Sequence, residues 1–72
     1  MDIFEVEQKE RLSREEVAAR LHNLADMLAR HNDIEFDRGG MRFTVRVPEE
    51  IELKLELEVG SAKRELEIEL TW

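Results

Sequence analysis

The side chains with the clearest chemistry in this sequence are glutamates that alternate with apolar residues near its end. Side chains two positions apart on a strand point to the same face, so these carboxylates should crowd one face of a sheet. Their oxygens could bind Mg²⁺ or Ca²⁺ weakly. The alternative is a solvated face that keeps a leucine-rich sheet soluble, and we favour it because no loop supplies the further oxygens that a cation needs. The residues concerned are Glu56, Glu58, Glu65, Glu67 and Glu69.

Catalytic chemistry has few candidates in this chain. His22 and His31 are the only two histidines, and they are nine positions apart, so they do not share a helical ligand face. Neither belongs to a recognisable nucleophile arrangement. The absence of cysteine excludes a thiolate metal site and a disulfide. We therefore expect a protein that is not an enzyme and that has no metal site and no cofactor.

Three arginines share one parity, which suggests a basic row on a sheet. They are Arg38, Arg42 and Arg46. Such a row could contact an anion or a phosphate group. The interpretation that we favour is ion pairing across neighbouring strands, and the partners would be Asp37, Glu52 and Glu56. The Gly39-Gly40 pair after Arg38 lacks the Lys-Ser/Thr of a phosphate loop.

Trp72 is the only tryptophan, and it ends the sequence. It has the parity of Leu66, Ile68 and Leu70, so it should point to the apolar face of its strand. A large ring there could pin the strand end by packing under the helix or the N-terminal arm, which is the role that we favour. The other role is an interaction anchor for a partner, which tryptophan often takes at interfaces.

Composition limits the class of protein. The 72 residues make one domain, 1–72, and the net charge of −7 argues against nucleic-acid binding. No apolar run approaches the roughly 20 residues of a membrane span, and the acidic start does not resemble a signal peptide. We expect a cytoplasmic protein that contacts no membrane.

A helix is predicted over 13–31. Ser13 and Glu16 have the spacing of a capping box, and Asn32 is suited to a left-handed end. Apolar residues recur at helical spacing between those ends. Before the helix, residues 1–12 are predicted as a weak strand or an arm, placed beside the last strand or beside 34–38. We prefer the first placement because it keeps the sheet antiparallel.

The segment 34–72 is predicted as an antiparallel meander. A Gly39-Gly40 turn would place Phe36 opposite Phe43 and Asp37 opposite Arg42. A loop of Pro48, Glu49 and Glu50 would then place Arg46 opposite Glu52 and Arg42 opposite Glu56. A last turn at 60–63 would put leucines opposite leucines and glutamates opposite glutamates or Lys54. The predicted fold is α+β, with one amphipathic helix on one face of a four- to five-stranded antiparallel sheet, in the order β-α-β-β-β-β.

With these elements in order, the chain resembles the amphi-Trp domain family. The resemblance rests on S-R-E-E-V-A at 13–18, L-x-x-L-A-D-x-L at 21–28, R-G-G at 38–40 and V-P-E-E-I-E-L at 47–53, and above all on the alternation that closes on Trp72. It covers roughly 4–72. It implies a small prokaryotic domain, and it brings no established activity, cofactor or catalytic residue.

The expected function is a non-enzymatic interaction or structural module, either a homodimer or a domain that docks on another protein. A helix of about 18 residues is ~27 Å long and ~10 Å wide, whereas four strands span ~19 Å. One helix would therefore leave about half of the apolar face bare, and such patches usually mark interfaces. The alternative is a small-ligand or divalent-cation-binding domain that uses the acidic sheet face.

Overall fold

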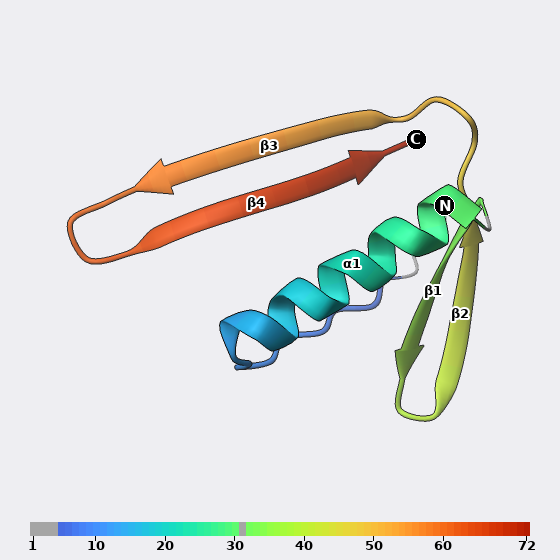
Figure 1. Ribbon diagram of the computed structural model, residues 1–72, viewed down its shortest axis with the longest axis horizontal. Coiled ribbons are helices and arrows are strands. Elements are labelled where there is room, and N and C mark those ends of the chain that lie inside the picture. The colour runs from blue at the N-terminus through green and yellow to red at the C-terminus, as the bar shows by residue number, and fades with distance from the viewer. Residues whose placement is uncertain (1–4, 31) are drawn as a thin grey trace.

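The computed structural model describes residues 5–30 and 32–72. Within them the order of elements is one helix followed by four strands (Figure 1). The helix is α1 (Arg14–Arg30), and the strands are β1 (Asp33–Arg38), β2 (Met41–Arg46), β3 (Glu52–Val59) and β4 (Arg64–Thr71). An α+β protein with antiparallel strands is thus confirmed.

The capping box at the start of α1 forms as the sequence predicts. The Glu16 amide donates to Ser13 Oγ at 3.1 Å, and the Glu16 carboxylate accepts from the Ser13 amide at 3.4 Å. These bonds satisfy amides that have no partner inside the helix. The helix ends at Arg30, and Asn32 has a positive φ of 56°, as expected for a left-handed helix end. His31 lies outside the described residues.

The first hairpin has the predicted register. Phe36 lies opposite Phe43, and Asp37 lies opposite Arg42. Gly39 and Gly40 have φ values of 59° and 79°, which a two-residue turn of this kind requires. The pattern of apolar and charged residues was therefore enough to align β1 with β2.

The second hairpin also has the predicted pairing. Its apolar pairs are Leu53 with Leu70, Leu55 with Ile68, and Leu57 with Leu66. Its charged pairs are Glu56 with Glu67, Glu58 with Glu65, and Lys54 with Glu69. One face of the hairpin is therefore apolar, and the other is predominantly acidic.

The prediction of one four- to five-stranded sheet is wrong. In the described residues the strands form two separate two-stranded sheets, β1–β2 and β3–β4. The Pro48-Glu49-Glu50 segment does not make the predicted turn, so Arg46 does not face Glu52 and Arg42 does not face Glu56 within the chain. Three-residue hairpin loops usually need a residue with positive φ, and none of residues 48–51, all of them described, has one.

The N-terminal strand of the predicted sheet is also absent from residues 5–12, which pair with no strand. They run alongside α1 as an extended segment (Figure 1). Glu10 holds this segment through an ion pair with Arg20, at 3.1 Å, and the Arg38 guanidinium donates to the Glu7 carbonyl. Polar contacts of the arm with the helix and with β1 thus take the place of strand pairing.

Little of the apolar surface is buried. Among the described residues only Val47 is buried, at 7% exposure, and its amide donates to the Asn32 carbonyl at 2.8 Å. Around it α1 packs on the first hairpin through half-buried side chains of Leu24, Met27 and Ile34. In the part of the chain that the structure describes, no Cα atom of the β3–β4 hairpin lies within 8 Å of a Cα atom in α1, β1 or β2. The second hairpin therefore stands outside the core.

Candidate functional site

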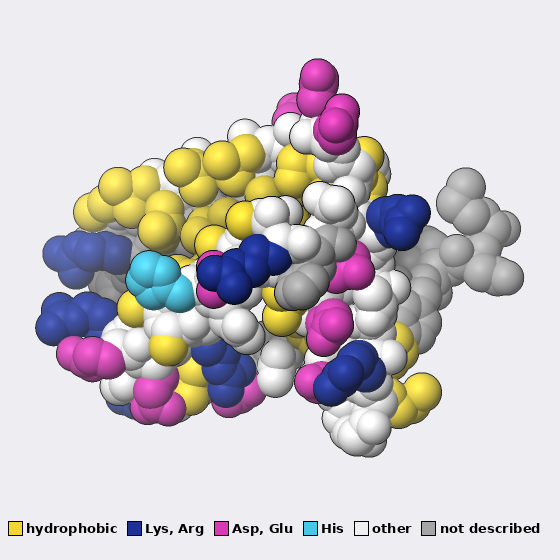
Figure 2. Space-filling view, turned by 45° about the vertical axis from the view of Figure 1, so that its right-hand side comes forward, with side chains coloured by type: hydrophobic (Ala, Val, Ile, Leu, Met, Phe, Trp, Pro, Cys, Tyr) yellow, Lys and Arg dark blue, Asp and Glu magenta, His cyan; other side chains and the backbone are white. Residues whose placement is uncertain are grey.

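One face of the β3–β4 hairpin is the most conspicuous surface of the molecule. We call it the apolar face, and it consists of Leu53, Leu55, Leu57, Val59, Leu66, Ile68, Leu70 and Trp72. The exposed fraction of its large side chains runs from 47% at Ile68 to 71% at Leu57, and Leu70 is half-buried. Figure 2 shows hydrophobic side chains gathered over this hairpin. A contiguous apolar patch of this kind usually marks an interaction surface.

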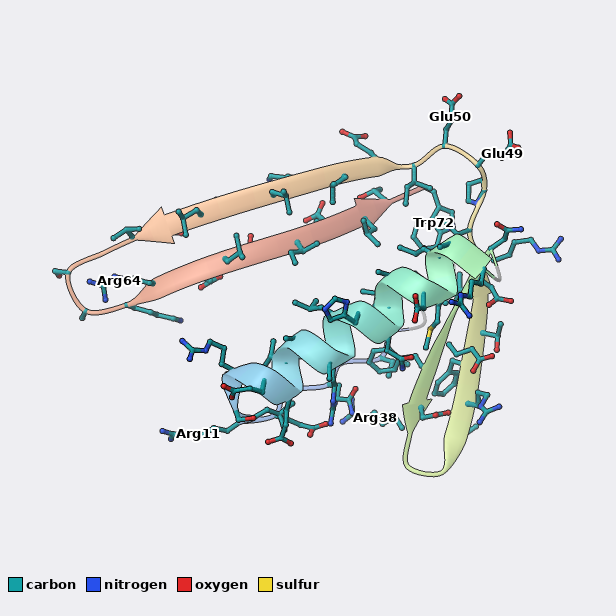
Figure 3. All side chains as sticks on the ribbon, in the orientation of Figure 1. Arg11, Arg38, Glu49, Glu50, Arg64 and Trp72 are labelled. Carbon is teal, nitrogen blue, oxygen red and sulfur yellow. The ribbon has the colours of Figure 1, made fainter. Side chains whose placement is uncertain are left out.

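Trp72 comes directly after β4, at the end of the apolar face (Figure 3). Its side chain is 50% exposed. Half of its surface is therefore covered within the chain, and its role as a packing residue or as an anchor stays a prediction. Half of a large ring remains available for contact with a partner.

The sequence-predicted glutamates do come together on the opposite face of the hairpin. Glu67 lies opposite Glu56, with Glu65 beside it on the same strand. A side-chain hydrogen bond with Glu65 and repulsion from its charge raise the pKa of Glu67, and repulsion from Glu56 adds to this. The ammonium group of Lys54 offsets part of this negative charge, because Lys54 Nζ lies 3.4 Å from Glu56 Oε2. Among the described residues no group of three or more His, Asp or Glu side chains is arranged to hold a metal ion.

The arginine row lies along β1 and β2. Arg42 Nε lies 3.3 Å from Asp37 Oδ1 and 4.0 Å from Glu35 Oε2, so the predicted pairing with Asp37 is confirmed. Arg46 has Asp33 as its strand neighbour, yet its side chain forms no ion pair with the residues that the structure describes. The other predicted partners, Glu52 and Glu56, belong to the second sheet. The arginine row therefore has no neighbouring strand among the described residues on the side of β2 that faces away from β1.

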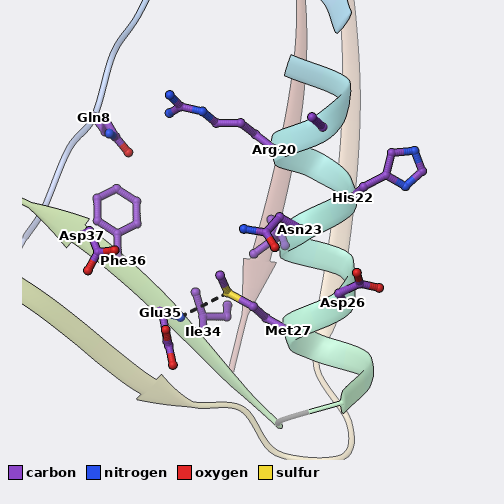
Figure 4. A pocket seen from close by; sticks show the side chains of 12 residues that line it. Gln8, Arg20, His22, Asn23, Asp26, Met27, Ile34, Glu35, Phe36 and Asp37 are labelled. Carbon is purple, nitrogen blue, oxygen red and sulfur yellow. Dashed lines mark hydrogen bonds between the residues drawn. The ribbon is translucent and has the colours of Figure 1, made fainter. Parts of the chain in front are cut away.

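An open groove of about 890 Å³ lies between α1, β1 and the N-terminal segment (Figure 4). Its walls include Gln8, Asn23, Met27 and Phe36, and the Glu35 amide donates to Met27 Sδ at 3.4 Å. The His22 imidazole points away from β1. No hydroxyl or thiol side chain is found among the described residues that line the groove, so nothing there forms a nucleophile arrangement.

The molecule exposes far more surface than a folded monomer of its mass. Its accessible area is 7191 Å² for 8.5 kDa, whereas roughly 4,700 Å² is expected. Its radius of gyration is 14.2 Å, against about 11 Å for a compact domain of this length. The sequence alone does not predict this excess of roughly 2,500 Å² of exposed area. The alternation gives each strand an apolar side, but it does not show which residues cover that side.

None of the described helices is both long and apolar enough to cross a membrane. The model of one protein family, the Amphi-Trp domain, matches residues 1–72, the whole chain. The chain therefore belongs to the Amphi-Trp family, which confirms the resemblance seen in the sequence. A search of curated proteins and a search of solved structures each found no match.

Proposed function

We propose that this Amphi-Trp domain is a non-enzymatic interaction module that acts as a homodimer, in which each copy covers the apolar face of the other. The observation that carries the proposal is the excess of exposed area on one chain together with its single buried side chain among the described residues, Val47. Domains of this size are marginally stable unless something staples them or they associate. Since the chain has no cysteine, association is the available route.

The area supports an obligate dimer. If each copy lost its excess of roughly 2,500 Å², the interface would bury about 5,000 Å² in total, a value typical of permanent homodimers. Weak encounters bury less than about 1,200 Å². The proposed interface would thus complete the hydrophobic core of each copy.

A second copy is a suitable occupant because it brings apolar surface of its own. Val17 and Leu21 on α1 are 43% and 45% exposed, although the sequence pattern assigns them to the inward stripe of the helix. The apolar face of one hairpin and the bare stripe of another copy's helix could bury each other. The acidic face of the hairpin would remain in water, where its charges repel least.

Light scattering across a concentration series tests the proposal. The wild-type chain should have twice the 8.5 kDa chain mass at micromolar concentration. Leu55→Lys places a charge in the middle of the apolar face and should weaken the dimer at least about a hundredfold, since burying an unpaired charge is costly. The matched control is Glu58→Lys on the opposite face, which should keep the dimer. A folded wild-type chain with the mass of one copy at high micromolar concentration would overturn the proposal.

The cytoplasmic location and the alternative of a cation- or small-ligand-binding domain stay predictions. The crowded carboxylates of β3 and β4 are exposed and lie on the face opposite the proposed interface. Light scattering with and without millimolar Mg²⁺ would separate the two functions, because a homodimer held by its apolar face should form equally well in both conditions.

A further inference from the structure

We infer that the two copies join edge to edge through β3, so that their second hairpins form one antiparallel sheet in the order β4-β3-β3-β4. This inference rests on the proposed function, and it names the strands that meet. The contact is the same patch on both copies, related by a two-fold axis that passes through the sheet at Leu55. An interface of this symmetry closes at two chains and does not extend into a fibre.

The outer edge of β3 has free backbone groups. At the turn of the hairpin the Gly60 amide donates to the Lys63 carbonyl at 2.9 Å, and hydrogen-bonded and non-hydrogen-bonded pairs alternate along an antiparallel ladder. With the observed register, the glutamates and the lysine of β3 therefore bond to β4. The amides and carbonyls of its leucines point the other way, where no strand pairs with β3 in the described residues. Such an edge can accept another strand.

The side chains of β3 match in the register centred on Leu55. Leu55 then lies opposite the same residue of the other copy, and Leu53 lies opposite Leu57. Each of these pairs brings outward-facing backbone groups together, as an antiparallel ladder requires. On the other face Lys54 lies opposite Glu56 of the other copy, and the two-fold axis repeats this pair. Opposite charges in such positions stabilise strand pairing.

Glu52 and Glu58 form the like-charged pair of this register. They face each other near the two ends of the ladder, and both are exposed, so that water and salt screen their repulsion. Glu58→Lys turns both copies of this pair into opposite charges. This variant should therefore not only keep the dimer but tighten it.

The edges of the first hairpin are less suited to pairing with themselves. The outer edge of β1 lies beside α1, and the Glu35 amide on that edge donates to Met27 Sδ at 3.4 Å. The outer edge of β2 is free, but pairing β2 with itself about Thr44 would set Arg42 opposite Arg46 twice. Like charges in these positions destabilise the contact.

The edge of β4 is also a poor contact for a second copy. The acidic face of β4 carries no lysine or arginine, and pairing β4 with itself about Ile68 would set Glu67 opposite Glu69 twice. In the view of Figure 1, β4 lies between α1 and β3, so that β3 is the outer strand of the hairpin. Among these edges, that of β3 is the one whose self-pairing brings a cation, Lys54, to a carboxylate.

The joined sheet has both apolar faces on the same side, because the two-fold axis runs perpendicular to it. The apolar face of each hairpin thereby continues into that of the other copy and loses its exposed edge along β3. The helix stripes with Val17 and Leu21 that cover this surface in the proposed dimer must approach from that side.

Two charge reversals of equal size test the junction. Glu56→Lys and Glu67→Lys change the net charge equally, and each removes the like-charged pair that Glu56 and Glu67 form within the hairpin. Only Glu56→Lys sets Lys54 against a lysine of the other copy. Glu56→Lys should therefore dimerise roughly tenfold more weakly than Glu67→Lys, and Glu67→Lys should dimerise at least as tightly as the wild type. Sedimentation equilibrium measures the three dissociation constants.

Mixing Glu56→Lys with Lys54→Glu tests the pairing in trans. Each variant alone has like charges at both central pairs, whereas in the mixed dimer every lysine of these pairs faces a glutamate. After refolding together from urea, the two chains should form mixed dimers in preference to dimers of either variant. The control mixes Glu67→Lys with Lys54→Glu, which have the same net charges but regain only one of the two opposite-charge pairs, and it should show no such preference. Native mass spectrometry counts the species.

The outcomes distinguish this inference from the proposed function. A wild-type chain that is monomeric would overturn both. A wild-type dimer for which Glu56→Lys associates as tightly as Glu67→Lys would overturn only the β3 junction. A mixture of Glu56→Lys and Lys54→Glu without a preference for mixed dimers would do the same.

The absence of cysteine allows a second test by cross-linking. The two copies of Leu55 would have Cα atoms about 5.5 Å apart, within the range for a disulfide. The two copies of Leu57 would lie four residues apart along the strands, about 13 Å, which is too far. Leu55→Cys should therefore oxidise to a linked dimer, and Leu57→Cys should link only when it is mixed with Leu53→Cys. Folded Leu55→Cys dimers that form no link, or linked dimers from Leu57→Cys alone, would overturn the register.

Discussion

At the scale of single residues, Trp72 links the sequence to the proposed interface. The alternation along β4 assigns it to the apolar side, and this parity follows from the sequence alone. The 50% exposure of its side chain could not be predicted from the sequence. It depends on which residues pack against the ring, either in the same chain or in another copy. Tryptophan is enriched among the residues that dominate binding energies at protein interfaces.

Trp72 should therefore be buried when two copies associate. Because the chain has one tryptophan and no tyrosine, its fluorescence reports this site alone. The emission maximum should move to shorter wavelength as the protein concentration rises through the dimerisation range. Trp72→Ala should weaken the dimer at least about tenfold, whereas Trp72→Phe should lose less. An emission maximum that stays constant while the mass doubles would exclude Trp72 from the interface.

At the scale of elements, the helix and the two hairpins could be predicted because their signals are local. Ser13 and Glu16 mark the start of α1, and Gly39-Gly40 fixes the register of β1 with β2. The junction between β2 and β3 could not be predicted from pairing alone. Its apolar and charged rows match as well as those of the true hairpins, yet Pro48-Glu49-Glu50 lacks the backbone conformation that a tight turn needs. Side-chain complementarity alone does not show that two strands pair, because the amides and carbonyls of the two edges must also face each other.

The acidic face of the β3–β4 hairpin should make its stability depend on pH. A raised pKa means that Glu67 binds its proton more readily in the folded hairpin than in the unfolded chain. Its contribution to stability is therefore present below the ordinary glutamate pKa of about 4.3 and is lost as the pH rises through the raised value.

Glu67→Gln should accordingly raise the melting temperature at pH 7, and this gain should disappear at acidic pH. The matched control is Glu69→Gln, which removes a carboxylate opposite Lys54 and should bring no gain at pH 7. Thermal melts at fixed protein concentration would measure both. An equal gain from the two variants at every pH would contradict the assignment of the effect to Glu67.

At the scale of the whole molecule, one chain has regular elements without a sufficient core. Apart from Val47, its described apolar side chains are half-buried or exposed, and roughly 2,500 Å² of surface is exposed beyond the expectation for its mass. The sequence suggested part of this shortage, because one helix is too narrow to cover four strands. It did not reveal that the second hairpin would stand apart from the helix. Folding and association are therefore expected to be a single process.

The dependence of unfolding on protein concentration tests this claim most directly. For an obligate dimer the unfolded chains are monomeric, so mass action makes the folded state more stable as the concentration rises. The midpoint of urea unfolding, followed by circular dichroism over a hundredfold range of concentration, should shift steadily to higher urea. The total change should correspond to about 2.7 kcal/mol in the free energy of unfolding, which is RT times the logarithm of one hundred. A cooperative transition whose midpoint is the same at every concentration would contradict the account.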